Sequence, residues 1–150
     1  MIKYIRTDSE NPDFIDLVCL LDADLAIRDG EDHAFYAQFN KIATLKNVIV
    51  AYENHVAVGC GAFKGYTPDI VEVKRMFVPE KLRGKGIASG LLSELEEWVK
   101  ELGYKGCILE TGIKQPEAIA LYHKNGYKII PNFGQYAGIE NSVCFEKNLS

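Results

Sequence analysis

Residues 83–88 read RGKGIA, a glycine-spaced basic turn between an apolar, strand-like run and a strongly amphipathic helical pattern. The two glycines allow backbone N–H groups to point into one concavity, because no Cβ blocks the approach or the unusual dihedrals. The helix that follows presents free N–H groups and the positive end of its dipole to the same spot. Arg83 and Lys85 add positive charge. The stretch therefore predicts a binding site for a phosphate or diphosphate group.

The segments beside this turn predict a strand, a crossover helix and a second strand. The run Ile70 to Val78 is typical of a strand and is stopped by Pro79. After the turn, apolar residues recur at helical spacing up to Leu102, and Gly103 is placed to end the helix. A short apolar strand, Cys107 to Glu110, follows. A unit of this length implies a parallel pair of strands with a right-handed connection.

Two better-known phosphate-binding loops do not match the spacing of this turn. The Walker pattern needs Ser or Thr after Gly-Lys, whereas here Ile87 follows Gly86. The dinucleotide fingerprint needs a third glycine where Ser89 stands, and its turn follows the strand directly, without residues 79–82. A turn that only joins a strand to a helix is a further alternative, since short glycine motifs also occur by chance.

Two motifs in this chain resemble those of the GNAT superfamily of acetyl-coenzyme A dependent N-acyltransferases. Arg83 to Ala88 match the signature Arg/Gln-x-x-Gly-x-Gly/Ala, and residues 118–127, AIALYHKNGY, resemble the second motif, a helix with Ala-x-x-Leu-Tyr that closes on Gly-Tyr. The resemblance covers most of residues 47–147 in the right order. Agreement of both motifs with the helix and strand between them is stronger than either motif alone. One departure is Gln115, where many family members carry Asn.

The resemblance implies that acetyl-CoA is the cofactor. It also implies a mixed central sheet of about six to seven strands, with helices on both faces. The turn at residues 83–89 would hold the pyrophosphate, and the end of the preceding strand would pair with the pantetheine arm. Backbone N–H groups near Phe77 and Val78 would donate to the oxyanion. The implied cofactor-binding residues are Met76, Phe77, Val78, Arg83, Gly84, Lys85, Gly86, Ile87, Ala88 and Ser89.

The same resemblance implies two catalytic side chains. Glu72, on the strand before the turn, is the candidate base for an amine that is mostly protonated at neutral pH, and Tyr122 is the candidate acid for the leaving thiolate. Each has a structural alternative. Glu72 could face outward and pair with Lys74 or Arg75. Tyr122 could simply pack, because it shares a helical face with other apolar residues.

The remaining sequence completes a single domain, residues 1–150, of the mixed α/β class. We expect a first strand to Arg6, helical segments between Asp13 and Ile42, and a hairpin of residues 48–52 and 56–63. A final strand pair, residues 127–130 and 143–146, is joined by a long polar and aromatic loop, residues 131–142. This loop, with its glycine hinges, could close over a small ligand or be an ordinary surface loop.

Bulk properties indicate a small cytoplasmic enzyme. The formal net charge of −4 and the lack of a basic stripe argue against nucleic-acid binding. No apolar run approaches the length of a membrane span, and the N-terminus reads as a strand and not as a signal peptide. The four cysteines are widely separated in apolar segments, which predicts reduced core thiols, and the three histidines do not cluster, which predicts no metal.

The acceptor is the part that the sequence defines least. We expect a small-molecule amine, because the aromatic loop favours a closed pocket; acyl transfer to a protein amine and a non-catalytic acyl-CoA sensing domain are the alternatives. A group of acidic residues could attract a cationic amine or could be helix caps on a solvated face. Its members are Asp22, Asp24, Asp29, Glu31 and Asp32. Similar proteins often form homodimers, and the sequence leaves the oligomeric state open.

Overall fold

The computed structural model describes residues 1–29 and 44–150. Its elements, in chain order, are β1 (Ile2–Thr7), α1 (Pro12–Asp29), β2 (Asn47–Glu53), β3 (Val56–Gly65), β4 (Ile70–Phe77), α3 (Ile87–Glu101), β5 (Gly106–Gly112), α4 (Pro116–Lys124), β6 (Lys128–Ile130) and β7 (Ser142–Asn148). The predicted strands and the two predicted motif helices are all present. Of the helical segments expected between Asp13 and Ile42, α1 is the described part, and residues 30–43 lie outside the described residues.

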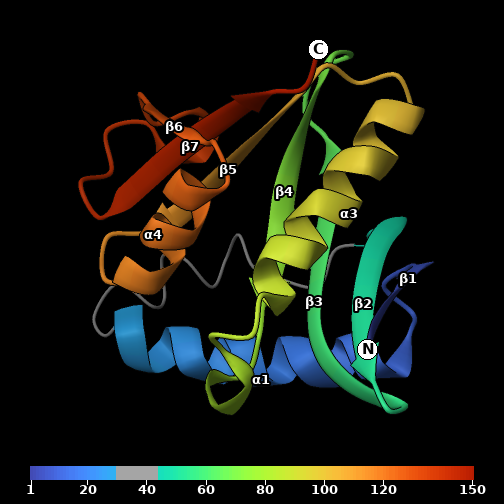
Figure 1. The fold of residues 1–150 in the computed structure, drawn as a ribbon. Helices are drawn as coiled ribbons and strands as arrows, with labels where there is room; N and C mark the ends of the chain where they lie inside the picture. The colour runs from blue at the N-terminus through green and yellow to red at the C-terminus, as the bar shows by residue number, and fades with distance from the viewer. Residues whose placement is uncertain (30–43) are drawn as a thin grey trace.

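The strands form one sheet in the order β1-β2-β3-β4-β5-β7-β6 (Figure 1). β4 and β5 are parallel, as the strand-helix-strand pattern predicts, and the other neighbouring pairs are antiparallel. The parallel pairing covers only Ile70–Glu72 opposite Gly106–Ile108. Beyond it the two strands diverge (Figure 1). Among residues 1–29 and 44–150, this opening leaves one edge of β4 without a strand partner from residue 73 onward.

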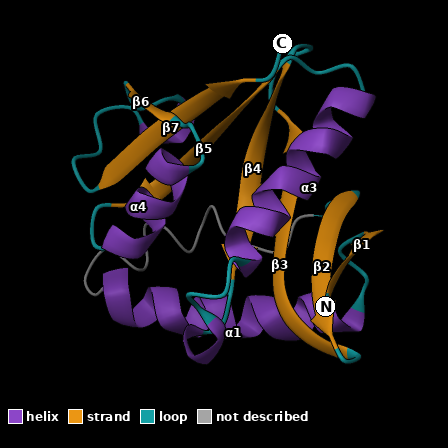
Figure 2. Ribbon diagram, viewed as in Figure 1, coloured by secondary structure: helices purple, strands orange, loops and turns teal. Residues whose placement is uncertain are grey.

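Helices cover both faces of the sheet, which confirms the predicted architecture (Figure 2). The core on one face is built around α3 and includes Leu91, Leu95 and Tyr122 of α4. The core on the other face contains α1 residues such as Phe14 and Val18 against β2 and β3. α1 runs across the end of the sheet where β4 and β5 have separated (Figure 1). Its inner face therefore closes one side of the opening.

A β-bulge in β4 shapes the strand at this opening. The register with β3 shifts between Cys60 and Ala62, so that residues 75 and 76 lie opposite Gly61. Arg75 adopts the left-handed conformation, with φ 59°. A Cβ at Gly61 would lie 2.5 Å from the Met76 sulfur, so the glycine makes room for the bulge. Bulges of this kind re-aim side chains, and this one brings Arg75 to the side of α1.

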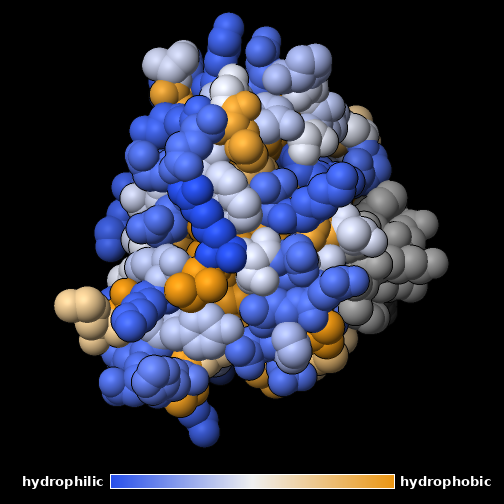
Figure 3. Space-filling view, turned by 90° about the vertical axis from the view of Figure 1, so that its right-hand side faces the viewer, coloured by the Kyte–Doolittle hydropathy of each residue, from blue (hydrophilic) through white to orange (hydrophobic). Residues whose placement is uncertain are grey.

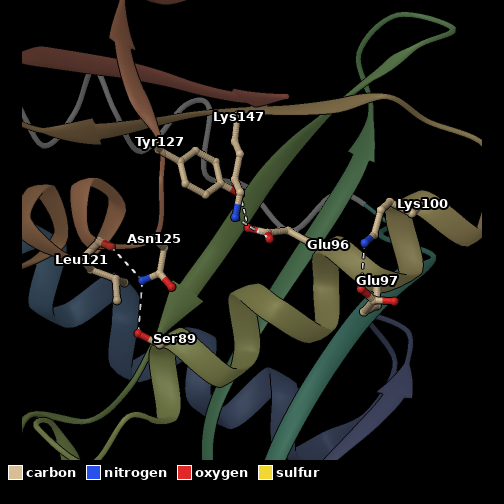
Figure 4. Close-up of polar contacts among 8 residues, drawn as sticks. All are labelled: Ser89, Glu96, Glu97, Lys100, Leu121, Asn125, Tyr127 and Lys147. Carbon is tan, nitrogen blue, oxygen red and sulfur yellow. Dashed lines mark hydrogen bonds and ion pairs between the residues drawn. The ribbon is translucent and has the colours of Figure 1, made fainter. Parts of the chain in front are cut away.

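Glu96 on the inner side of α3 links the helix to the second half of the sheet (Figure 4). Its carboxylate accepts a 3.0 Å hydrogen bond from the Tyr127 hydroxyl and lies 2.8 Å from the Lys147 ammonium. Burial, with the nearby Cys107 and Glu96, raises the pKa of Tyr127, so its hydroxyl remains a donor over the ordinary pH range. The link therefore holds α3 against the part of the sheet that contains β7.

We expect Glu96→Ala to lower the free energy of unfolding by about 2 kcal/mol, because it leaves a buried tyrosine hydroxyl and a lysine without their charged partner. Glu97→Ala is the matched control. Glu97 pairs with Lys100 one turn along the same helix, at 2.8 Å, but both side chains are exposed (Figure 4). It should change stability little. Urea unfolding of both variants measures the difference, and equal losses would contradict the linking role of Glu96.

Most of the cysteine prediction is confirmed. Cys60, Cys107 and Cys144 are free and buried, and burial raises the pKa of Cys60 to about 12. The prediction is wrong for Cys19, which is exposed. The face of α1 that packs on the sheet includes Val18, the residue before Cys19. Cys19 lies on the opposite, solvent-facing side of the helix.

The side of the molecule seen in Figure 3 is dominated by hydrophilic residues with small, separate hydrophobic patches. The edge strand β1 is held to α3 by a bidentate ion pair of Arg6 with Glu101, with hydrogen bonds of 2.6 and 2.7 Å. Arg6 also stacks over the Trp98 ring.

In the described ranges, no helix has the length and hydropathy needed to cross a membrane. The same ranges contain no cluster of three or more metal-ligating side chains, and His33 lies outside them.

Candidate active site

Two cavities meet where β4 and β5 separate. The larger, of about 300 Å³, lies between the start of α3 and α4, and the smaller, of about 110 Å³, lies between the diverging strands and Tyr136. Five residues line both cavities: Leu21, Met76, Gln115, Ala118 and Tyr122. The arrangement therefore offers two ligand sites that share a wall, with a tyrosine at their junction.

The glycine turn and the first turn of α3 form one end of the larger cavity. Gly84 and Gly86 have φ values of 84° and 81°, a region that residues with a Cβ rarely adopt. A Cβ at either position would meet no atom within 4 Å, so the space beside the backbone is open. α3 begins at Ile87 with no side-chain cap on its N-terminus. Its first N–H groups are thus available to an anion, as the sequence predicts.

The structure brings together all but one of the predicted cofactor-binding residues. Met76, Phe77, Val78, Arg83, Gly84, Gly86, Ile87, Ala88 and Ser89 line the larger cavity. Lys85 is exposed and is not among the lining residues. Ser89 also accepts a 3.1 Å hydrogen bond from the Asn125 amide, which in turn donates to the Leu121 carbonyl (Figure 4). This contact fixes the start of α3 against the end of α4.

Arg83 braces the turn and is not simply a free charge in the cavity. Its Nε donates a 2.8 Å hydrogen bond to the Val78 carbonyl. Its two Nη atoms lie 3.8 Å from Asp24 of α1 and 3.7 Å from Glu117 of α4. These partners lie far from the turn in the sequence, and sequence reasoning missed both. Two carboxylates therefore offset part of the charge of Arg83.

The unpaired edge of β4 forms the wall between the turn and the junction. Met76, Phe77 and Val78 line the larger cavity along this edge. A strand edge without a partner can pair, main chain to main chain, with an extended ligand. The wall therefore suits a flexible arm that runs from the turn toward Tyr122.

Tyr122 is buried at the junction, with 6% of its surface exposed. Its ring packs against those of Tyr127 and Phe145, at 5.8 and 5.7 Å between centroids. Burial raises its pKa, and the nearby charge of Glu110 raises that pKa further. The phenol therefore stays protonated at neutral and mildly alkaline pH and can donate a proton or a hydrogen bond. The ring packs, as the alternative interpretation predicts, and the residue also lines both cavities, so its role as an acid stays a prediction.

Glu72 and Glu110 occupy different places relative to the smaller cavity. Glu72 is 5% exposed and is not a lining residue; one carboxylate oxygen lies 3.7 Å from the Lys74 ammonium, the pairing that the sequence offered as an alternative. Glu110, at the diverging end of β5, lines the cavity near Tyr122. Sequence reasoning missed Glu110. A charged residue at the carboxyl end of an otherwise buried parallel strand is the signal that could have found it.

The predicted acidic group and the aromatic loop reach the site in part. Asp24 lines the larger cavity, and Asp22 pairs with Arg75. Glu31 and Asp32 lie outside the described residues, and the structure does not describe the side chain of Asp29. From the loop, Tyr136 lines the smaller cavity. The Asn132 amide donates to two carbonyls of the same loop, at 2.8 and 3.0 Å, so the loop is braced internally.

Comparisons with known proteins agree with this geometry. Residues 14–127 match the sequence model of the Acetyltransferase (GNAT) family. The chain is 39% identical over 106 residues to the IAA acetyltransferase of Azospirillum brasilense, which is 67% of either chain. A crystal structure from Klebsiella pneumoniae, described as an acyl-CoA N-acyltransferase, superposes with a TM-score of 0.84 at 29% identity, covering 100% of this chain and 99% of the other.

A second crystal structure, of a GNAT family acetyltransferase from Elizabethkingia anophelis, was solved with acetyl-CoA bound. It superposes with a TM-score of 0.69 at 19% identity and covers 99% of this chain and 98% of the other. The fold and the family match define an acyltransferase of the acetyl-CoA dependent kind. The chain belongs to the GNAT acetyltransferase family.

Proposed function

We propose that the protein transfers an acetyl group from acetyl-CoA to the primary amine of a small molecule, by direct attack while both substrates are bound. The observation that carries the proposal is the meeting of two cavities at Tyr122. The larger has the open glycine turn at one end and the unpaired edge of β4 along its wall. The smaller has charged side chains in its lining and is lined by the same tyrosine. Acetyl-CoA, bound in the larger cavity, would supply the activated acetyl group. The acceptor amine would bind in the smaller cavity.

Different parts of the larger cavity would bind different parts of the cofactor. Backbone N–H groups at Gly86 to Ser89 would hold the diphosphate, aided by the positive end of α3. The β4 edge from Met76 to Val78 would pair with the pantetheine arm and donate N–H groups to the thioester oxygen. The reacting carbon would then lie near Tyr122, where the two cavities meet. Tyr122 would then protonate the sulfur of the leaving group, which its raised pKa permits.

The acceptor amine must lose a proton before it can attack. With a reference pKa near 10.4, only about one alkyl amine in a thousand is uncharged at neutral pH. Glu72 is one candidate base, acting through water, because its charge helps to raise the pKa of Tyr136, which lines the smaller cavity. Glu110 is a second candidate, because it lines the cavity beside Tyr122.

Direct transfer is favoured over an acetylated enzyme by the cysteines. No cysteine lines either cavity. Burial raises the pKa of Cys60 and of Cys107 to about 12, which keeps both thiols in their unreactive, protonated form. We therefore expect the intact mass of the protein to be unchanged after incubation with acetyl-CoA alone.

The function is tested by release of free CoA thiol from acetyl-CoA in the presence of amino acids, polyamines, aminoglycosides and lysine peptides. We expect release with one class of small amine, together with a product heavier by one acetyl group. Release with lysine peptides alone would contradict the small-molecule assignment. Tight binding of acetyl-CoA without release for any amine would favour a sensing domain.

A further inference from the structure

Resting on the proposed function, we infer that the acceptor carries a carboxylate beside its amine, as an amino acid does. The smaller cavity, which would hold the acceptor, is lined by side chains of both charges. Lys74 and Arg75 of β4 are positive, and Glu110 of β5 is negative. The carboxylate of the acceptor pairs with Arg75, and its ammonium lies at Glu110.

Arg75 has an unsatisfied donor inside the protein. Its side chain is 6% exposed, and its Nη1 donates a 2.9 Å hydrogen bond to Asp22, whose side chain is 44% exposed. Its Nη2 is buried and has no hydrogen-bond partner among residues 1–29 and 44–150. A guanidinium offers five donors in a rigid fork that fits a carboxylate. Leaving such a donor unpaired inside a protein is unfavourable, and an anionic ligand that accepts a hydrogen bond from it removes this cost.

The β4 bulge is what brings Arg75 to this position. A left-handed φ of 59° is an unfavourable conformation for arginine, and the structure holds it where the strand turns its side chain toward α1. Strained backbone of this kind is often kept where a side chain has a binding role. Arg75 lines the cavity from this bulge, next to Lys74, whose charge is offset by Glu72 at 3.7 Å. Arg75 is itself paired with Asp22 through Nη1, so what distinguishes it on this wall is Nη2, the buried donor without a hydrogen-bond partner in the described part of the chain.

Glu110 fixes which end of the acceptor lies near the chemistry. Glu110 is close enough to Tyr122 for its charge to add to the effect of burial and raise the pKa of the phenol further. A carboxylate attracts an ammonium group, so the amine end lies at Glu110, beside Tyr122, where the acetyl group must be. The carboxylate end then points to Arg75 on the other strand. The polarity of the cavity thus orients a zwitterion for attack.

The size of the cavity limits the rest of the acceptor. Its volume of about 110 Å³ suits a small molecule, and Leu21, Leu25 and Val73 provide an apolar part of its lining. A peptide chain would have to extend beyond this cavity. We therefore assign small amino carboxylates, and not polyamines or protein lysines, as the acceptor class.

The test compares acceptors that differ only in the carboxylate: each of the twenty standard amino acids against its carboxamide, with acetyl-CoA at saturation. For the preferred side chain we expect kcat/KM to be about 100-fold higher with the acid than with the amide. Arg75→Gln should remove most of this preference, and Arg75→Lys should keep part of it. The dissociation constant for CoA should be unchanged in both variants, and Arg6→Gln, which removes an arginine at the far edge of the sheet, should leave the preference intact.

Calorimetric titration of the same amino acids and amides into the CoA-loaded protein gives a readout that does not depend on turnover. Binding of acids in preference to amides, without any acetylation, would support the inference and contradict the proposed function. Equal acetylation of acids and amides would support the function and overturn the inference. Failure of every amino acid to bind and to react would also overturn it. The comparison of acceptors on the unmodified protein remains decisive even if the Arg75 variants do not fold.

Discussion

Gly86→Glu is expected to weaken CoA binding by at least about 100-fold, because it adds a carboxylate where the diphosphate would meet the N-terminus of α3. Gly86 ends the open turn at a φ of 81°, and a Cβ built there meets no atom within 4 Å. The new side chain is therefore free to occupy the anion site. Isothermal titration with CoA measures the effect directly.

Backbone strain from the substitution needs a separate control, since a left-handed conformation costs a residue with a Cβ about 1–2 kcal/mol. Gly103→Glu supplies it. Gly103 follows α3 at its other end, has a φ of 91°, and a Cβ there also meets nothing within 4 Å. We expect both variants to lose similar thermal stability and only Gly86→Glu to lose CoA binding. Undiminished CoA binding by Gly86→Glu would remove the turn from the site.

Tyr122→Phe is expected to lower kcat by about 100-fold or more, the usual contribution of a general acid, while CoA binding stays the same. The phenylalanine keeps the ring contacts with Tyr127 and Phe145, so the melting temperature should change little. Because the pKa of Tyr122 is raised, the acid form persists as pH increases toward and beyond the ordinary tyrosine value. Tyr122→Phe should therefore lower kcat both at neutral pH and at pH 9.

Tyr127→Phe is the matched control for this experiment, because Tyr127 is also a buried tyrosine of the same cluster. Its hydroxyl bonds to Glu96 and lines neither cavity. We expect Tyr127→Phe to lower stability and to leave kcat nearly unchanged. If Tyr122→Phe retained the full rate at both pH values, the proposed acid role would be wrong and Tyr122 would be a packing residue.

The fold was predictable because its elements have strong local patterns. The helical spacing after residue 86, the stop at Pro79 and the β2–β3 hairpin all appear where the sequence places them. The bulge at Arg75 was not predictable, because left-handed positions are normally signalled by glycine and here the glycine is the opposing Gly61. The separation of β4 from β5 follows from packing across the sheet, which no local pattern records.

The cofactor end of the site was predictable for a similar reason, since its geometry depends on consecutive backbone from residue 83 to residue 89. The sequence predicted the surroundings of two charged side chains at this turn, Arg83 and Lys85, less accurately. Lys85 is exposed, and Arg83 is held by carboxylates of α1 and α4 that are distant in sequence. The acceptor end was largely invisible, because Arg75, Glu110 and Tyr136 come from three segments that only the fold brings together.

The central claim is that the two cavities joined at Tyr122 bind acetyl-CoA and its acceptor. Hydrogen–deuterium exchange of the protein with and without saturating CoA tests it most directly. We predict slower exchange at residues 76–89 and 115–122, and no change at residues 52–55, which line a separate hollow beside β1. Slower exchange confined to that hollow, or to any segment outside the larger cavity, would contradict the account.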